Sequence, residues 1–278
     1  MASAGMRIMA DATRSSMQPL FERDGMRRLD ALVKPGVLCA FDFDGTLAPI
    51  VARPEQVRLP PGIRPRLVEL ARHAAVAIVT GRAIADIKPR LGFEPAYIVG
   101  NHGLEGVPGW AQRIGEYREI CRDWIMQLAS VEDEPGVQIE DKTYSLSVHY
   151  RLAPDQGAAA DRLRVRFGGL MPAPHVIEGK CVFNLLPRNT VNKGIALVRL
   201  IEVSGAAGAV YVGDDVTDED VFRLRRPDIL TVRIEYAPGS AAEFFVPERG
   251  GIARVLDLLI ARLSSRRRRA FQEIRGTS

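Results

Sequence analysis

The stretch from Val37 to Thr46 constrains this chain most, because an apolar segment typical of a buried strand ends directly in two carboxylates and a turn. Open α/β sheets bind ligands at the carboxyl ends of their parallel strands, so chemistry is expected at Asp42 and Asp44. In an extended backbone these two side chains point the same way, and a cation would relieve their repulsion. The alternative is that both residues only end a strand and begin a turn.

Three further apolar segments also end in polar residues. They cover residues 74–79, 96–99 and 209–212, and each has the length and composition of a buried strand. The polar groups that follow them are Thr80-Gly81-Arg82, Asn101-His102 and Asp214-Asp215. Helical spacing at 63–73 and 83–91 predicts helices between the first strands. This alternation predicts an α/β fold with a Rossmann-like parallel sheet and right-handed crossovers.

The sequence changes character between residues 107 and 187. A helix is predicted at 114–131, followed within 138–151 by antiparallel strand structure in which apolar and polar residues alternate. A helix at 158–167 and strands at 174–177 and 181–186 complete an αββαββ order. We therefore predict an α+β domain inserted at 107–187.

The rest of the chain is predicted to form the core, as residues 27–106 and 188–278. Helices at 195–203 and 252–263 and strands at 209–212 and 229–234 resume the earlier alternation. Residues 1–26 show no clear periodicity, so a flexible N-terminal extension is expected there.

Composition bounds the classes of function. At 278 residues, with 46% hydrophobic and 26% charged residues, the chain can bury a core and a smaller second domain. No apolar run approaches the roughly 20 residues that span a bilayer, and the first residues lack the apolar centre of a signal peptide. Three cysteines, an odd number, suit reduced thiols. We expect a cytoplasmic monomer without a membrane partner.

The net charge of +4 is too mild to indicate nucleic acid, and it is equally compatible with phosphorylated small molecules. Three or four carboxylates around one point select a hard cation, and Mg²⁺ typically takes one or two of them plus water and phosphate. Thr80 can offer a hydroxyl and Lys193 a point charge to phosphoryl oxygens. Asp42 is then left as the nucleophile.

At this point the residues resemble the haloacid dehalogenase-like (HAD) phosphatases. The resemblance rests on Asp42-x-Asp44-Gly-Thr, Thr80, Lys193 and Gly213-Asp-Asp-x-x-Asp218. More narrowly, the chain resembles the trehalose-6-phosphate phosphatase family. The motifs that carry this are Thr80-Gly-Arg82, Asn101-His-Gly103, Glu140-x-Lys142, His149-Tyr-Arg151, Asn192-Lys-Gly194 and the acidic run from Gly213 to Asp220.

The resemblance implies Mg²⁺-dependent hydrolysis of trehalose 6-phosphate to trehalose and phosphate through an aspartyl-phosphate. It implies Asp42 as nucleophile, Asp44 as general acid and base, and Thr80 and Lys193 on the phosphoryl group. Mg²⁺ would be held by Asp42, the Asp44 carbonyl and Asp214. The inserted domain would be a cap. Substrate contacts are implied for Arg82, Asn101, His102, Glu140, Lys142, Arg151 and Asn184, and support of the metal and lysine for Asp215 and Asp218.

Two positions depart from the family pattern. Asn184 stands where these phosphatases usually carry Glu, and Asn101 stands where Ser is common. Because a neutral amide replaces an anionic acceptor, Asn184 predicts a raised KM for trehalose 6-phosphate, which Asn184→Glu would lower. The alternatives are a phosphatase for another sugar phosphate and a sensor that binds a sugar phosphate without turnover.

Simpler interpretations remain for several residues. His102 is as compatible with a structural hydrogen bond as with a substrate contact. Glu219 and Asp220 are predicted to be a solvated helix N-terminus that complements the helix dipole. Residues Arg266 to Arg269 are predicted to be a solvated helix end, with a polybasic contact to nucleic acid or membrane as the alternative.

Overall fold

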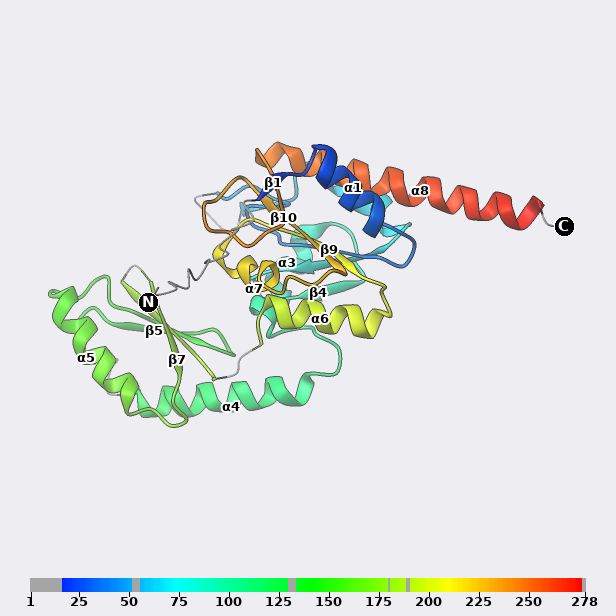
Figure 1. Ribbon diagram of the computed structural model, residues 1–278. Helices are drawn as coiled ribbons and strands as arrows, with labels where there is room; N and C mark the ends of the chain where they lie inside the picture. The colour runs from blue at the N-terminus through cyan, green and yellow to red at the C-terminus, as the bar shows by residue number, and fades with distance from the viewer. Residues whose placement is uncertain (1–16, 52–55, 130–133, 180, 189–190, 277–278) are drawn as a thin grey trace, which may run out of the picture.

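The protein is described here by a computed structural model covering residues 17–51, 56–129, 134–179, 181–188 and 191–276 (Figure 1). It contains a seven-stranded parallel sheet and a four-stranded antiparallel sheet, each with its own helices. The predicted fold class, an α/β core with an inserted α+β unit in αββαββ order, is confirmed. None of the helices in the described residues is both long and apolar enough to cross a bilayer.

The parallel sheet has the strand order β1-β11-β10-β9-β2-β3-β4. Its strands are β1 (Gln18–Pro19), β2 (Leu38–Phe41), β3 (Ala75–Val79), β4 (Tyr97–Val99), β9 (Ala209–Gly213), β10 (Ile229–Ile234) and β11 (Phe244–Val246). Its helices are α1 (Arg23–Leu32), α2 (Ile63–Ala71), α3 (Ile84–Leu91), α6 (Lys193–Ser204), α7 (Glu219–Phe222) and α8 (Ile252–Gly276). Short 3₁₀ turns form at Asn101–Gly103, Val216–Asp218 and Arg249–Gly251.

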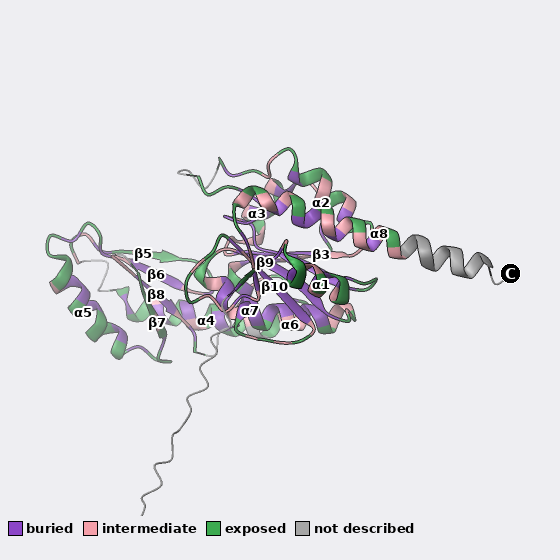
Figure 2. Ribbon diagram, turned by 45° about the horizontal axis from the view of Figure 1, so that its top comes forward, coloured by how far each residue is buried: buried purple, intermediate pink, exposed green. Residues whose placement is uncertain are grey.

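Both faces of this sheet are covered, which explains why its strands are apolar throughout (Figure 2). In β2, Cys39 and Phe41 pack with residues of α1, α2, α3 and α8 on one face. Leu38 and Ala40 alternate with them and pack with residues of α6 and α7 on the other. Phe41 pairs with Ile78 of β3 and with Val212 of β9, so the carboxyl ends of these three strands meet at one edge.

The first described residues belong to the core, which corrects the prediction of a flexible extension for residues 17–26. Strand β1 pairs in parallel with β11, and Met17 and Leu20 are buried on its two sides. Strand β1 has only two residues, which is too short for the periodicity of the sequence to reveal it. Residues 1–16 of the predicted extension lie outside the described residues. At the other end, α8 continues past the predicted end at 263 and projects from the core (Figure 1).

We call residues 111–186 the inserted unit. It comprises α4 (Ala111–Gln127), β5 (Gln138–Asp141), β6 (Leu146–His149), α5 (Gln156–Gly168), β7 (His175–Gly179) and β8 (Val182–Leu186). Its antiparallel sheet has the order β5-β6-β8-β7, and one face packs against α4 and α5. Trp124 of α4 is fully buried there, and its indole N–H donates to the Pro172 carbonyl at 2.7 Å.

A small apolar cluster joins the inserted unit to the core. Leu104 of the core packs with Tyr117 of α4, Tyr144 of the β5–β6 turn and Val191 of the returning chain. Trp110, directly before α4, packs against this cluster and against the core. These contacts fix where the inserted unit leaves and rejoins the parallel sheet.

Candidate active site

Lys193 lies between two buried carboxylates at the carboxyl end of β2. Its Nζ is 2.7 Å from Asp42 Oδ1 and 2.7 Å from Asp218 Oδ1. Lys193 begins α6, whose N-cap residue Asn192 accepts a hydrogen bond from the Ile195 amide. Burial alone would lower the pKa of Lys193, but the charges of Asp42 and Asp218 outweigh it and raise that pKa above its ordinary value. The lysine therefore stays charged in the site.

The Asp218 carboxylate accepts several hydrogen bonds that hold the acidic loop after β9 in place. Besides Lys193, it accepts hydrogen bonds from the Tyr211 hydroxyl at 2.6 Å and from the Asp214 and Asp215 amides at 2.9 and 2.8 Å. Its side chain is completely buried. Because a carboxylate has about four acceptor positions, Asp218 has little capacity left for a metal ion. Its support of Lys193 is what the sequence predicts.

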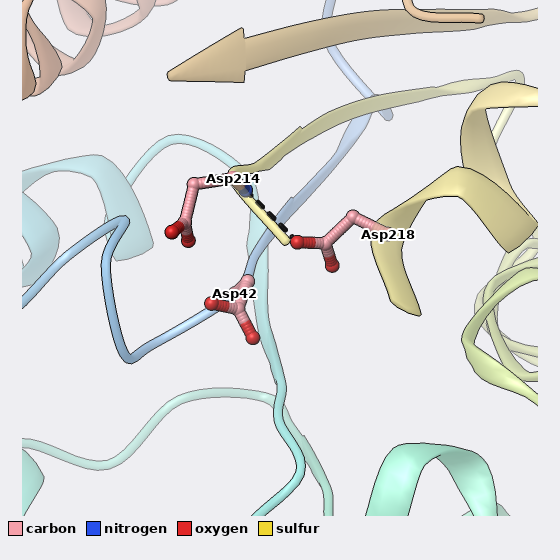
Figure 3. A group of neighbouring side chains, drawn as sticks. All are labelled: Asp42, Asp214 and Asp218. Carbon is pink, nitrogen blue, oxygen red and sulfur yellow. Dashed lines mark hydrogen bonds between the residues drawn. The ribbon is translucent and has the colours of Figure 1, made fainter. Parts of the chain in front are cut away.

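Asp42, Asp214 and Asp218 each have a carboxylate oxygen that lies within 4.8 Å of those of the other two. Figure 3 shows the three side chains. Asp214 accepts a hydrogen bond from the Thr46 hydroxyl at 2.8 Å. Gly45 lies close by with a φ of +89°, and a Cβ on it would come 2.0 Å from Asp214 Oδ2, so only glycine fits. Burial raises the pKa of Asp42 well above its ordinary value and that of Asp214 to about 6.

Crowded carboxylates with raised pKa values repel one another when ionised, and a hard divalent cation that binds them relieves this repulsion. Asp42 and Asp214 fit this role, since Asp218 is occupied elsewhere. The main-chain carbonyl of Asp44, the third predicted ligand, stays a prediction. Asp215 is exposed and accepts from the Val216 amide, so it caps the following turn instead of facing the other carboxylates.

We expect Mg²⁺ to stabilise the protein more at pH 7.5 than at pH 5. The raised pKa of Asp214 means that its contribution to stability without metal is present below about pH 4 and is lost as the pH rises toward 6. A metal ligand must be deprotonated, so Mg²⁺ recovers this loss only at the higher pH. The check is the melting temperature with and without Mg²⁺ at both pH values, at matched ionic strength. Equal shifts at both would contradict the assignment of Asp214.

Arg82 engages both oxygens of Asp44. Its Nε lies 2.6 Å from Oδ2 and its Nη2 2.7 Å from Oδ1, while its Nη1 bonds Asp86 at 2.8 Å. Asp86 is held in turn by Arg90, four residues further along α3. The predicted substrate contact at Arg82 is therefore, in this state, a bidentate partner of the predicted acid and base. A leaving-group oxygen would have to displace the guanidinium from Asp44.

Thr80, Asn101 and His102 meet at the carboxyl ends of β3 and β4, and β3 is the neighbour of β2 in the sheet. The Thr80 hydroxyl accepts from the Arg82 amide at 3.2 Å, and the His102 amide donates to the Thr80 carbonyl at 3.0 Å. Asn101 and His102 both have positive φ, 47° and 56°. A Cβ on Gly81 would come 2.3 Å from the His102 ring, so this ring lies directly on the Thr80-Gly81 turn.

A family model for trehalose-phosphatase matches residues 40–243, which include all of these side chains. The chain belongs to the trehalose-phosphatase family. It is 33% identical over 238 residues to the trehalose-phosphate phosphatase of Mycobacterium avium, covering 77% of this chain and 61% of that protein. The chain thus spans about three fifths of the length of the curated relatives it matches.

Solved structures of trehalose-6-phosphate phosphatases and a related protein are similar to this chain in fold. A crystal structure of a trehalose-6-phosphate phosphatase related protein is 25% identical, with a TM-score of 0.59 over 81% of this chain and 97% of that one. The Aspergillus fumigatus trehalose-6-phosphate phosphatase is 24% identical, with a TM-score of 0.63 over 88% and 99%. The second likeness concerns the fold alone.

The inserted unit of this trehalose-phosphatase family member carries the other predicted substrate contacts. Glu140 accepts from His149 Nε2 at 3.1 Å and lies 3.8 Å from Lys142 Nζ. Asn184 accepts from the Ser147 hydroxyl at 2.6 Å. Arg151 lies in an exposed turn after β6 and contacts Gln156 through its carbonyl.

The ionisation of His102 responds to charges from the core and from the inserted unit. Crowding by the surrounding loops is the largest cause that lowers the pKa of His102. The positive charges of Lys193 and, least, of Lys142 add to it, while the charges of Asp215 and Asp218 act in the opposite direction. A neutral imidazole here can still donate or accept one hydrogen bond.

Other supporting residues were not predicted. Thr46 stands in the Asp-Gly-Thr motif, and Tyr211 is the polar residue of an otherwise apolar strand. The sequence around each of them could therefore have indicated a role in the site. No sequence feature near Arg249 indicated such a role, because its Nε donates to the Gly45 carbonyl, at 2.8 Å, across 204 residues of sequence separation. It holds the turn that carries Asp44.

The prediction for Glu219 is wrong. It lies in the first turn of α7, but it is buried, accepts from the Ala241 amide at 2.9 Å and pairs with Arg233 at 3.4 Å. Its carboxylate joins α7 to the segment before β11 instead of facing solvent. Of the basic run, Arg266 donates to the Asp30 carbonyl at 2.6 Å, whereas the side chains of residues 267–269 lie outside the described part.

Proposed function

We propose that this chain is an Mg²⁺-dependent phosphatase that hydrolyses trehalose 6-phosphate to trehalose and phosphate. The observation that carries the proposal is the buried bridge of Lys193 between Asp42 and Asp218, with Asp214 beside it. It provides a nucleophile, a fixed positive charge and a second carboxylate at one strand edge. Family membership supports trehalose 6-phosphate as the substrate.

In the proposed reaction an Asp42 carboxylate oxygen attacks phosphorus, and the bond from phosphorus to the sugar oxygen breaks. Asp44, released from Arg82 and protonated from solvent, gives this proton to the leaving oxygen. It later takes a proton from the water whose attack on phosphorus breaks the bond to the Asp42 oxygen and releases phosphate. Lys193 neutralises phosphoryl charge, and Thr80 offers its hydroxyl. Mg²⁺, held by Asp42, Asp214 and the Asp44 carbonyl, would supply further charge neutralisation.

The domain proposed at 107–187, which contains the inserted unit, acts as a cap over the core, and that core comprises 188–278 and the residues from 17 to 106. The packing of Leu104, which directly follows the Asn101–Gly103 turn, against Tyr117 and Tyr144 supports an arrangement in which this unit borders the phosphate site. A cap excludes water and adds contacts to the sugar, as lids commonly do. Substrate contacts are proposed for Asn101, His102, Glu140, Lys142, Arg151 and Asn184. We propose a cytoplasmic monomer that binds neither nucleic acid nor membrane.

A second candidate is a phosphatase for another sugar phosphate, favoured by Asn184 at a position where the family resemblance leads one to expect Glu. Phosphate release from trehalose 6-phosphate, sucrose 6-phosphate and glucose 6-phosphate, each with Mg²⁺ and with EDTA, tests both. We expect the highest kcat/KM for trehalose 6-phosphate, and no turnover with EDTA. Another preferred substrate would favour the second candidate. Binding without phosphate release from any of them would point to a sensor.

A further inference from the structure

A row of polar side chains crosses the face of the inserted unit's sheet that is turned away from α4 and α5. Glu140, Ser147 and Asn184 stand opposite one another on β5, β6 and β8. Their strand neighbours, such as Val148 and Phe183, pack against α4 and α5. Because side chains alternate along a strand, the polar row lies on the other face, which does not pack against these two helices. In Figure 1 the strands lie between α5 and the core.

Ser147 is the buried member of this row. Only 1% of its surface is exposed, and its hydroxyl donates to Asn184 Oδ1 at 2.6 Å. A hydroxyl has one proton, and this one is used. A sugar therefore cannot reach Ser147, but it can reach Asn184, which is partly exposed. Ser147 can act on a substrate only through Asn184.

The hydrogen bond decides which half of the Asn184 amide remains available. Oδ1 is occupied by Ser147, so the two N–H groups of Nδ2 are the free hydrogen-bonding groups. On the same face, Glu140 is held by His149 and Lys142 and offers carboxylate oxygens. The row thus presents a donor at Asn184 and an acceptor at Glu140.

We propose that Ser147 is a positioning residue that fixes Asn184 as a hydrogen-bond donor to a hydroxyl oxygen of the sugar. This inference rests on the proposed function. Each sugar hydroxyl both donates and accepts, so a fixed donor and a fixed acceptor on one row recognise a polyhydroxylated ring. It reverses the expectation that position 184 should be an acceptor, and that Asn184→Glu should lower KM.

Ser147→Ala tests the positioning role. With the purified full chain, we expect KM for trehalose 6-phosphate to rise roughly three- to tenfold, the factor that one neutral hydrogen bond corresponds to, while kcat changes little. The ratio of kcat/KM for trehalose 6-phosphate to that for p-nitrophenyl phosphate should fall by the same factor, because the aryl ester has no sugar. Ser204→Ala, which removes a hydroxyl bonded to the Ile201 carbonyl of α6, is the matched control.

A double-mutant cycle separates positioning from packing. If Ser147 acts only through Asn184, the KM of Ser147→Ala/Asn184→Ala should equal that of Asn184→Ala alone. Additive effects, or an equal loss of kcat on both substrates, would overturn the proposal.

Asn184→Asp tests the direction of the hydrogen bond without touching Ser147. The carboxylate keeps an acceptor for the Ser147 hydroxyl but has no N–H groups. We expect KM for trehalose 6-phosphate to rise at least threefold. An unchanged or lower KM would show that position 184 accepts from the sugar and would overturn the inference. If the unaltered protein does not hydrolyse trehalose 6-phosphate at all, the proposed function fails first, and the two failures are distinguishable.

Discussion

Replacing Asp42 with asparagine is expected to lower kcat for trehalose 6-phosphate by roughly 10⁴-fold or more, while the protein stays folded. An amide oxygen is a far weaker nucleophile than a carboxylate, and removal of a nucleophile in other enzymes costs on this order. The amide keeps the shape of the original side chain, and Lys193 retains Asp218 as its partner. The measurement is phosphate release together with the melting temperature.

Asp257→Asn is the matched control for this variant. Asp257 lies on α8 and pairs with Arg66 in an exposed bridge, so the same chemical change there should leave kcat unaltered within about twofold. Turnover by Asp42→Asn within tenfold of the unaltered protein would remove Asp42 from the nucleophile role.

Lys193→Met is expected both to abolish turnover and to destabilise the fold by about 3–5 kcal/mol. Breaking a buried ion pair by removing one partner leaves uncompensated charge, here on Asp42 and Asp218 together. The free energy of unfolding from urea titration measures it. Lys34→Met, at an exposed lysine, provides the control and should change stability by less than about 0.5 kcal/mol.

The pH dependence of Lys193→Met distinguishes charge from packing. Without the ammonium group, burial raises the pKa of Asp42 further, so the contribution of Asp42 to stability is present at low pH and lost as the pH rises. The destabilisation should therefore be smaller at pH 5 than at pH 8. A loss that is equal at both values would instead indicate that the methionine side chain packs badly.

The sequence was most informative where a strand ended in polar residues. Strands β2, β3, β4 and β9 were visible because buried parallel strands are apolar on both faces, and their carboxyl ends meet at one edge in the structure. That rule brought Asp42, Thr80 and Asp214 together in advance. The αββαββ order of the inserted unit was equally readable, since its strands alternate and its helices show the longer period.

Contacts between distant segments could not be read in this way. The bonds of Arg82 to Asp44 and of Arg249 to Gly45 depend on how loops from different strand ends approach one another. An acidic residue in the first turn of a helix is common at surfaces, which is why the sequence favours a solvated Glu219. Only the packing of α7 against the chain before β11 makes it a buried partner of Arg233.

The placement of the two tryptophans gives this protein a natural optical label. Trp124 is enclosed within the inserted unit and Trp110 stands at its junction with the core, and the chain has no others. Intrinsic indole emission therefore reports on the inserted unit through Trp124 and on its junction with the core through Trp110, whereas none of the strands of the parallel sheet contains a tryptophan. A comparison of emission with calorimetry, which senses every residue, would separate the melting of the two parts without attaching any dye.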